Sequence, residues 1–322
     1  MNLLTNFSRS TNRRALAGLS LAPLLVLSAC GDGGSEALSG DDSGGGEVVI
    51  AHQAYTEMEI MAEIYAGVLE DAGYSPTLQP VDTRDLYVPP LSKGNVDLVP
   101  DYASSMTEFL NRDTNGEDAD PVASPDVEET VSQLEQLGAE YVVEPLEPAE
   151  AEDANAYAVT QEFSEENSVL TLSDLGGLGE PVALAAAPDC PERPDCQLGL
   201  KSVYGIEVSN FEPLGFGTVQ TKDALESGEV DLGQVGTSDG SLESLGLVVL
   251  EDDMDWQNAE NLTPVVNSDF LAENPDVADS LNELSGVLTT EDLMSLNAQV
   301  DVERMLAADV AATYLEDKGL VG

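Results

Sequence analysis

The sequence predicts an α/β protein with two similar lobes. Short apolar segments alternate with longer segments of helical apolar spacing over most of the chain after residue 46. A pattern also recurs: residues 91–98 and 225–232 share Leu, Gly, Val, Asp and Leu in register. Alternation of strands and helices indicates parallel-rich sheets. With 322 residues, the chain exceeds what one core usually serves, so we expect two domains.

The elements of the first half follow from apolar spacing and from helix stops. Residues 47–51 form an apolar run typical of a buried strand. Residues 57–72 carry apolar side chains at helical spacing and end at Gly73, and a second helix is expected over 86–92, before Gly94. A strand is expected over 96–99.

The second half repeats this alternation. We expect strands at 181–187 and 230–232, and helices at 198–204 and 221–227, the latter stopped by Gly228. In each copy of the repeat, a helix ends at glycine and a short buried strand follows. Ligands bind at the carboxyl ends of strands in open α/β sheets. Two lobes that face each other across such ends therefore predict a binding cleft.

Charge limits the possible partners. The chain has 62 acidic and 11 basic residues, a formal net charge of −51, and 42% hydrophobic residues. Phosphate would repel such a polyanion, which excludes nucleic-acid binding, while the apolar content is sufficient for a core. An acidic surface of this kind suits a salty exterior, where ions screen self-repulsion, so we expect a halophilic host.

The first 30 residues predict export. Three arginines precede an apolar run over 15–27, and the run ends in Leu-Ser-Ala-Cys30, which resembles the bacterial lipobox. The run is too short to cross a hydrocarbon core as a helix. We expect a signal peptide over 1–29, lipid attachment at Cys30 and a flexible Gly/Ser/Asp tether up to residue 46. The Arg13-Arg14 pair leaves the choice between Sec and twin-arginine export open.

The other two cysteines, Cys190 and Cys196, lie in one Pro-rich segment. In an exported protein we expect them to form a disulfide. Their spacing is wrong for a zinc knuckle, and the only histidine, His52, is distant in sequence. We therefore expect no metal site.

Five motifs carry a family resemblance. They are His-Gln-Ala-Tyr-Thr-Glu at 52–57, Val-Asp-Leu-Val-Pro-Asp-Tyr at 96–102, Gly-Leu-Lys-Ser-Val-Tyr-Gly at 199–205, Thr-Ser-Asp at 237–239, and Leu-Thr-Thr-Glu-Asp-Leu at 288–293 through Asn297. Together they resemble the solute-binding lipoproteins of osmoprotectant ABC importers, the ProX/OpuC type for glycine betaine, carnitine and choline. The resemblance covers 47–322.

The resemblance implies a two-lobed periplasmic-binding-protein fold of type II, with mixed sheets flanked by helices and a hinge. Lobe 1 would comprise 47–154 and 262–322, and lobe 2 would comprise 155–261. It also implies a monomeric receptor, not an enzyme, that needs no cofactor. Lipid-anchored on the outer face of the cytoplasmic membrane, it would capture a small osmolyte and deliver it to a permease driven by an ATPase.

The resemblance implies ligand contacts residue by residue. A quaternary ammonium group is held by aromatic faces, and a ligand carboxylate by polar or cationic donors. Tyr102 and Tyr157 match two cage tyrosines, Ser105 and Arg193 match carboxylate-binding positions, and Gln53 matches a polar position. We expect Tyr55, Tyr87 and Tyr204 to pack in the core. Thr237 and Asp239 remain open between cleft contact and helix capping.

The sequence also departs from the family pattern. Two aromatic cage positions correspond to Gly236 and to the region near Asn261. Trp256 or Tyr204 is a candidate substitute, and a solute less methylated or shaped differently remains an alternative. A second alternative is a hydrolase, because residues 236–240 match Gly-x-Ser-x-Gly around Ser238, but no histidine follows His52.

Overall fold

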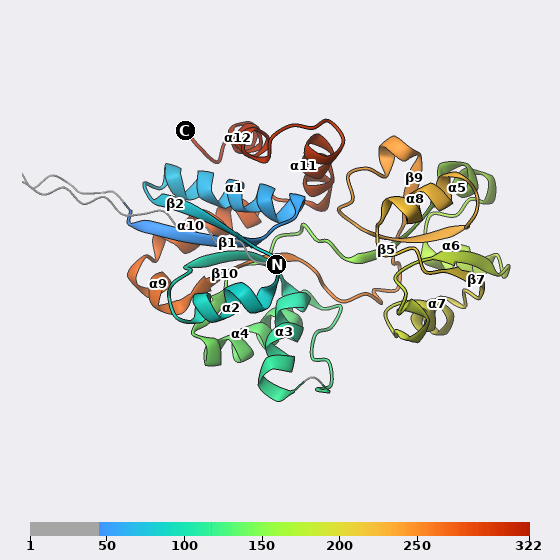
Figure 1. Ribbon diagram of the computed structural model, residues 1–322, viewed down its shortest axis with the longest axis horizontal. Coiled ribbons are helices and arrows are strands. Elements are labelled where there is room, and N and C mark those ends of the chain that lie inside the picture. Colours follow the sequence, from blue (N-terminus) through green and yellow to red (C-terminus); the bar gives the residue numbers. More distant parts are fainter. Residues whose placement is uncertain (1–44, 117) are drawn as a thin grey trace, which may run out of the picture. The chain divides into compact units, whose positions relative to one another are not determined.

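The computed structural model describes residues 45–116 and 118–322 (Figure 1). The expected signal peptide, Cys30 and most of the tether lie outside these residues. The described chain forms two five-stranded mixed sheets with helices on both faces of each. Among the described residues, no helix is long and apolar enough to cross a membrane.

The first sheet has the strand order β2-β1-β3-β10-β4. Its strands are β1 (Glu47–Gln53), β2 (Ser75–Val81), β3 (Leu98–Tyr102), β4 (Val143–Pro145) and β10 (Leu262–Asn267). Strand β1 is parallel to both β2 and β3, whereas β10 is antiparallel to β3 and β4. Successive side chains of β1 point to opposite faces: Val48 and Ile50 join one core cluster, and Ala51 joins the other.

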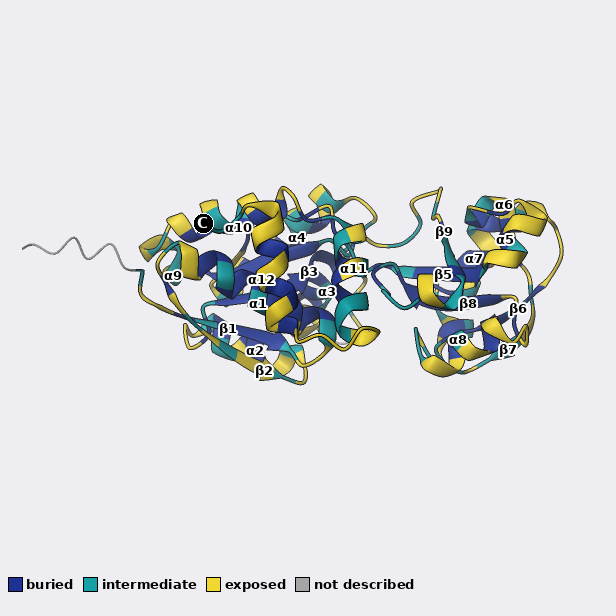
Figure 2. Cartoon of the chain, turned by 90° about the horizontal axis from the view of Figure 1, so that it is seen from above, coloured by how far each residue is buried: buried dark blue, intermediate teal, exposed yellow. Residues whose placement is uncertain are grey.

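Eight helices cover this sheet. They are α1 (Thr56–Asp71), α2 (Arg84–Ser92), α3 (Ala103–Asn115), α4 (Val127–Gly138), α9 (Ser268–Glu273), α10 (Asp276–Ser285), α11 (Thr290–Asp301) and α12 (Ala307–Lys318). Helices α1, α10, α11 and α12 pack on one face, while α2, α3 and α4 pack on the other. Figure 2 shows the buried strands between helices that keep their exposed sides outward. Helices from the C-terminal part of the chain therefore cover the same sheet that contains β1.

The second sheet has the order β7-β6-β8-β5-β9. Its strands are β5 (Asn155–Thr160), β6 (Val182–Ala185), β7 (Val208–Glu212), β8 (Leu232–Gly236) and β9 (Leu247–Leu250). Its helices are α5 (Gln161–Asn167), α6 (Leu172–Gly177), α7 (Gln197–Tyr204) and α8 (Val219–Glu226). Strand β6 is parallel to β7 and β8, and β5 is antiparallel to its two neighbours. The directions match those of the first sheet strand for strand.

The repeated motif builds the same connection twice. Asp97 accepts a hydrogen bond from the backbone N–H of Val49 at 2.8 Å, and Asp231 accepts one from Ala183 at 2.8 Å. The central strands begin at Leu98 and Leu232, later than we expected, and run on to Tyr102 and Gly236. The expected strands at 96–99 and 230–232 were thus placed too early.

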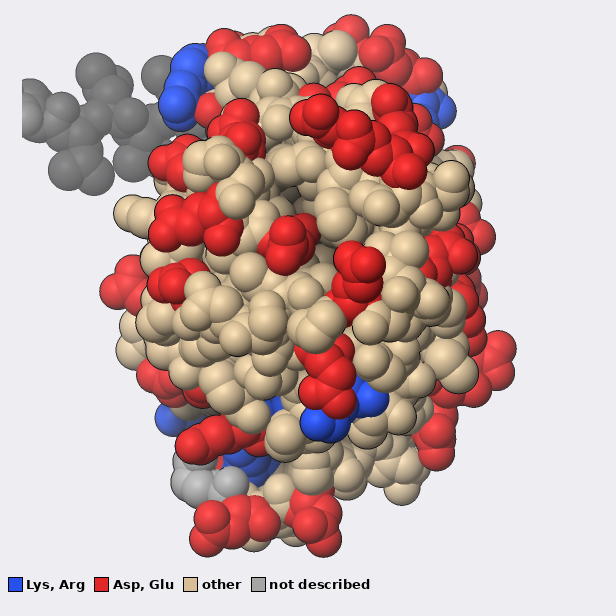
Figure 3. Space-filling model, turned by 90° about the vertical axis from the view of Figure 1, so that its right-hand side faces the viewer, with Lys and Arg blue, Asp and Glu red and all other residues tan. Residues whose placement is uncertain are grey.

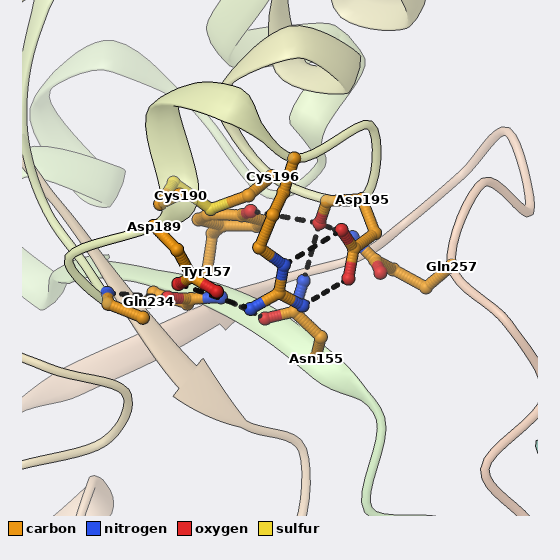
Figure 4. The surroundings of a disulfide bond; sticks show 10 residues. Asn155, Tyr157, Asp189, Cys190, Asp195, Cys196, Gln234 and Gln257 are labelled. Atoms are coloured by element: carbon orange, nitrogen blue, oxygen red, sulfur yellow. Dashed lines mark hydrogen bonds and ion pairs between the residues drawn. A yellow bond between two sulfur atoms is a disulfide. The ribbon is translucent and has the colours of Figure 1, made fainter. Parts of the chain in front are cut away.

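A disulfide joins Cys190 to Cys196, whose Cα atoms lie 5.2 Å apart (Figure 4). Both cysteines are fully buried in the core cluster that contains Tyr157 and Leu200. Among the charged side chains of the surface, acidic ones predominate: patches of Asp and Glu are spread over the face in Figure 3, where Lys and Arg form only small groups.

Candidate ligand-binding site

A cavity of about 290 Å³ lies where the carboxyl ends of β1 and β8 come near each other. Residues from both sheets line it: Tyr55, Thr56, Glu57, Asp153, Phe216, Gly217, Lys222, Gly236, Ser238, Asp239, Gly240, Asn297 and Asp301. Carboxyl ends of strands are the expected ligand site of open α/β sheets. The cavity therefore lies at the end of β8, one of the two strands of the repeated motif, whereas no residue of β3, the other strand, lines it.

Two partly exposed aromatic residues line this cavity. Tyr55 is 42% exposed and Phe216 is 45% exposed. At Gly236, a Cβ atom would lie 3.5 Å from the Phe216 ring and only 2.3 Å from Asp153 Oδ1. Position 236 has no room for the aromatic that the family pattern places there. The loop that precedes α8 supplies a ring beside it instead.

A buried hydrogen-bond network forms one wall. The Tyr102 hydroxyl donates to Glu57. Asn297 Nδ2 donates to Glu57 Oε2 at 2.5 Å and to the Ser238 carbonyl at 3.0 Å. Burial raises the pKa of Tyr102 well above its usual value, so the phenol stays neutral. Asn297 Oδ1 is buried and has no hydrogen-bond partner among the described residues.

Carboxylates dominate the charge of the cavity. Burial, and then the Glu57 charge, raises the pKa of Asp153 to about 7, whereas hydrogen bonds from Ser238 lower it. Lys222 is the one basic residue of the lining, and its Nζ donates to Asp239 Oδ2 at 2.8 Å. Asp301 Oδ1 accepts a hydrogen bond from the Thr56 hydroxyl at 2.7 Å. The lining is therefore net negative.

The structure places Tyr157 in the core of the second sheet. It is fully buried, and its ring stacks on Trp256 with centroids 6.2 Å apart. Tyr204 packs edge-on against Trp256 at 6.0 Å. None of these three rings is among the residues that line the cavity.

The guanidinium of Arg193 pairs with acidic residues close to it in the sequence. It pairs with Asp195 through Nε and Nη2, and Nη1 lies 3.7 Å from Asp189. Figure 4 shows Asn155 and Gln257 beside Asp195, and both amides donate to its carbonyl, at 2.8 and 3.1 Å. Arg193 does not line the cavity. Its charge is already matched by carboxylates.

Ser105 and Thr237, two of the remaining predicted positions, bind the segments that connect the two sheets. Ser105 donates through its hydroxyl to Glu260 Oε1 at 2.9 Å, and Thr237 donates to the Glu152 carbonyl at 2.9 Å. Asp239 lines the cavity and also accepts the Ser241 N–H at 3.0 Å.

Gln53 ends β1, and its carbonyl accepts the Tyr55 N–H at 3.0 Å. Of the seven ligand positions taken from the resemblance, only Asp239 lines the cavity directly, while Tyr102 supports it through Glu57.

Several residues of the site were missed in the sequence. The expectation that Tyr55 packs in the core is wrong, whereas Tyr87 and Tyr204 are buried as expected. Phe216 and Asp153 carry no local signal, because a loop and a segment between the two sheets bring them to the cavity. Glu57 and Asn297 belong to motifs of the family resemblance, which was the only signal for them.

A second cavity, of about 390 Å³, lies beside β5 and β9. Its lining includes Asn155, Thr237 and Asn261 but no aromatic residue. A quaternary ammonium ion gains most from aromatic faces, so the smaller cavity suits such a ligand better.

The described residues give little support to a hydrolase centred on Ser238 or to a metal site. Ser238 is only 4% exposed, and His52, the only histidine of the sequence, lies in β1 with Nδ1 3.0 Å from the Gln53 carbonyl. Within residues 45–116 and 118–322, no group of three or more His, Cys, Asp or Glu is placed to hold a metal ion.

Comparison with known proteins gives consistent matches. Residues 46–317 match the family model described as the substrate binding domain of an ABC-type glycine betaine transport system. The glycine betaine-binding protein YehZ of Escherichia coli is 27% identical, over 84% of this chain and 90% of the relative. A glycine-betaine-binding protein of Pseudomonas aeruginosa is also 27% identical, over 84% of this chain and 88% of the relative.

Solved structures agree with these matches. Apo YehZ from E. coli has a TM-score of 0.74 at 26% identity, covering 85% of this chain and 99% of the neighbour. A structure described as a glycine betaine/carnitine/choline ABC transporter has a TM-score of 0.75 at 20% identity, covering 85% and 99%. The expected two-sheet α/β fold of type II periplasmic binding proteins is confirmed.

Proposed function

The chain belongs to the family of substrate-binding domains of ABC-type glycine betaine transport systems, and we propose that it captures a small quaternary ammonium solute in the cavity between Tyr55 and Phe216. Members of this family are the extracytoplasmic binding components that work with a permease and an ATPase. Candidate solutes are glycine betaine, choline and related osmoprotectants. One observation carries the proposal: two partly exposed aromatic residues and four carboxylates line the same cavity at the carboxyl ends of β1 and β8.

Quaternary ammonium groups explain this combination. They neither donate nor accept conventional hydrogen bonds, so a protein holds them through ring faces, each worth about 0.5 to 2 kcal/mol, and through nearby negative charge. Tyr55 and Phe216 come from different sheets, so a bound solute gains contacts from both.

In this proposal, capture is a binding step alone, in which no covalent bond forms or breaks. A ligand that touches residues of both sheets favours any arrangement in which all these contacts form at once, and binding shifts the population toward that state. We propose lobes of 47–154 with 262–322 and of 155–261, joined by a hinge at the segments around Asp153 and Glu260. The assignments of Gln53, Tyr157 and Arg193 to the ligand site remain predictions.

The proposed location of the protein rests on the predicted signal peptide. We propose that the signal peptide is cleaved before Cys30, that a lipid anchors the monomeric receptor to the outer face of the cytoplasmic membrane, and that the tether keeps it near the permease. The acidic surface, with 62 Asp and Glu residues in the sequence, suits a halophilic host.

The proposed function is tested by thermal unfolding with candidate solutes. At one hundred times its dissociation constant, a ligand stabilises the native state by about 2.7 kcal/mol, which raises the melting temperature by several degrees. We expect such a rise with glycine betaine or choline. Phe216→Ala should lose most of it, whereas Val219→Ala, an exposed residue on α8 outside the cavity, should keep it. A protein that no quaternary ammonium solute stabilises, or a full shift in Phe216→Ala, contradicts the proposal.

A further inference from the structure

Asp153 lies beside Gly236, the last residue of β8. Its Oδ1 lies 2.3 Å from the position of a Gly236 Cβ, and Asp153 and Phe216 both line the cavity there. A carboxylate therefore lies beside an aromatic ring at this end of the cavity. Because a carboxylate attracts a cation and repels an anion, Asp153 affects which solutes fit.

The charges around Asp153 reinforce the same preference. The charged residues of the lining are Glu57, Asp153, Asp239 and Asp301 against Lys222 alone. The Lys222 ammonium donates to Asp239 at 2.8 Å and to the Ser241 hydroxyl at 2.8 Å, so its charge is already matched. A ligand carboxylate placed in this cavity would find no unmatched cationic side chain among those that line it.

The donors of the wall are also engaged. The Tyr102 hydroxyl and the Asn297 amide nitrogen both donate to Glu57. One acceptor of the wall is unpaired: Asn297 is only 6% exposed, and its buried Oδ1 has no partner among the described residues. A buried acceptor without a partner costs free energy until a donor or a positive charge reaches it. This atom points to a ligand that carries a donor, such as a hydroxyl group.

Arg193, the expected partner of a ligand carboxylate, does not alter this balance. Its guanidinium pairs with Asp195 and faces Asp189, and it is not part of the lining. Recruiting it would require breaking the pair with Asp195.

We propose that Asp153 is the specificity-determining residue of the site and that the cavity selects a net cationic quaternary ammonium alcohol, of the choline type, over zwitterions that carry a carboxylate. The inference rests on the proposed function, because it assigns the solute class of the same cavity. Tyr55 and Phe216 would hold the methyl groups, Asp153 would supply the counter-charge, and the ligand hydroxyl would donate to Asn297 Oδ1.

Titration of Asp153 supports this assignment. Burial and the Glu57 charge raise its pKa to about 7, and a bound cation favours the ionised form. The charged groups that face it are Glu57 on α1, Asp239 after β8 with Lys222 on α8, and Asp301 on α11; the Tyr55 and Tyr102 hydroxyls, whose pKa values burial raises, stay neutral. Choline affinity should therefore rise between pH 6 and pH 8, and it should lose this dependence in Asp153→Asn.

The test is calorimetric titration of the purified protein with three ligands of similar shape. Choline is cationic, glycine betaine is zwitterionic, and 3,3-dimethyl-1-butanol is the uncharged analogue of choline. The neutral analogue lacks the charge that would pair with Asp153, and glycine betaine adds a carboxylate that the acidic lining repels. We therefore expect choline to bind about tenfold or more tighter than either of the others. Asp153→Asn should weaken choline about tenfold and bring choline and glycine betaine close together.

The matched control is Glu226→Gln, which removes one charge from an exposed position on α8, outside this cavity. It should change both affinities less than twofold. Glycine betaine binding as tightly as choline, or the neutral analogue doing so, would overturn the inference while leaving the proposed function intact. Failure of both choline and glycine betaine to bind would instead overturn the proposed function. The wild-type ratios decide the question even if Asp153→Asn folds poorly.

Discussion

The central strands of the two sheets occupy equivalent places but end in different chemistry. Each strand, β3 or β8, lies between a parallel and an antiparallel neighbour and follows the same Gly-x-Val-Asp connection. Strand β3 ends in Asp101 and Tyr102, and β8 ends in Val235 and Gly236 at the matching positions. The repeat therefore fixes where a strand ends, whereas the residues at that end decide what the sheet contributes to the cavity.

The first sheet contributes a rigid polar network. Asp101 is fully buried, accepts a bidentate pair from Arg84 and accepts the Tyr87 hydroxyl. The second sheet contributes space, because Gly236 lets Asp153 and Phe216 approach. The end of β3 is thus fixed by hydrogen bonds and an ion pair, whereas the end of β8 leaves room for side chains from other segments.

The largest difference between the two ends should appear in stability. Asp101→Asn leaves the buried Tyr87 hydroxyl and the Arg84 charge poorly matched, which should lower the free energy of unfolding by about 3 to 5 kcal/mol. Val235→Ala at the matching position removes only two methyl groups and should cost about 2 kcal/mol. Chemical denaturation measures both. Equal losses would mean that the Asp101 network has no special role in the first sheet.

The connecting segments should make the ligand-free protein sensitive to pH. Burial raises the pKa of Glu260 to about 7, from 4.5, and that of Asp153 to about 7, from 3.8. Between the unfolded and folded values, only the folded state keeps these protons. The free energy of unfolding should therefore fall as pH rises from about 4.5 to about 7, by about 3 kcal/mol for Glu260, and stay level above.

Glu260→Gln should remove its own share of this slope, since the amide does not titrate. Glu273→Gln, an exposed position on α9, is the control and should keep the slope. Denaturation midpoints from pH 5 to pH 8 give the comparison. A slope that is unchanged in Glu260→Gln would show that this carboxyl group does not carry the raised pKa.

The smallest effect tests the likeness of the two sheets. Asp97→Ala and Asp231→Ala each remove one carboxylate that accepts a backbone N–H at 2.8 Å. Each should cost about 1 kcal/mol, slightly more for the half-buried Asp97 than for the exposed Asp231. Thermal unfolding of the two variants measures this directly. A large loss in one variant and none in the other would show that the repeat does not build equivalent connections.

The fold was largely predictable because its signals are local. Apolar spacing and glycine stops indicated β1, α1, α2, α7 and α8 close to their observed bounds. The central strands were placed too early because Val96 and Val230 are buried yet lie in the connections before the strands. Apolar pattern reports burial, and it does not distinguish a buried connection from a hydrogen-bonded strand.

The site was less predictable because long-range packing assembles it. Asp153 and Phe216 stand in segments without periodicity, and only the folded chain brings both to Gly236. Tyr157 lies in a strand, where a tyrosine belongs as readily to the core as to a ligand site, and here it stacks on Trp256 in the core. Residue type alone does not separate these roles.

The most direct measurement is a crystal structure of the protein grown with choline. The account predicts one choline molecule in the cavity lined by Tyr55, Asp153 and Phe216, with its trimethylammonium group against the two rings and its hydroxyl toward Asn297. Choline found instead in the larger cavity beside Asn155 and Asn261 would contradict it.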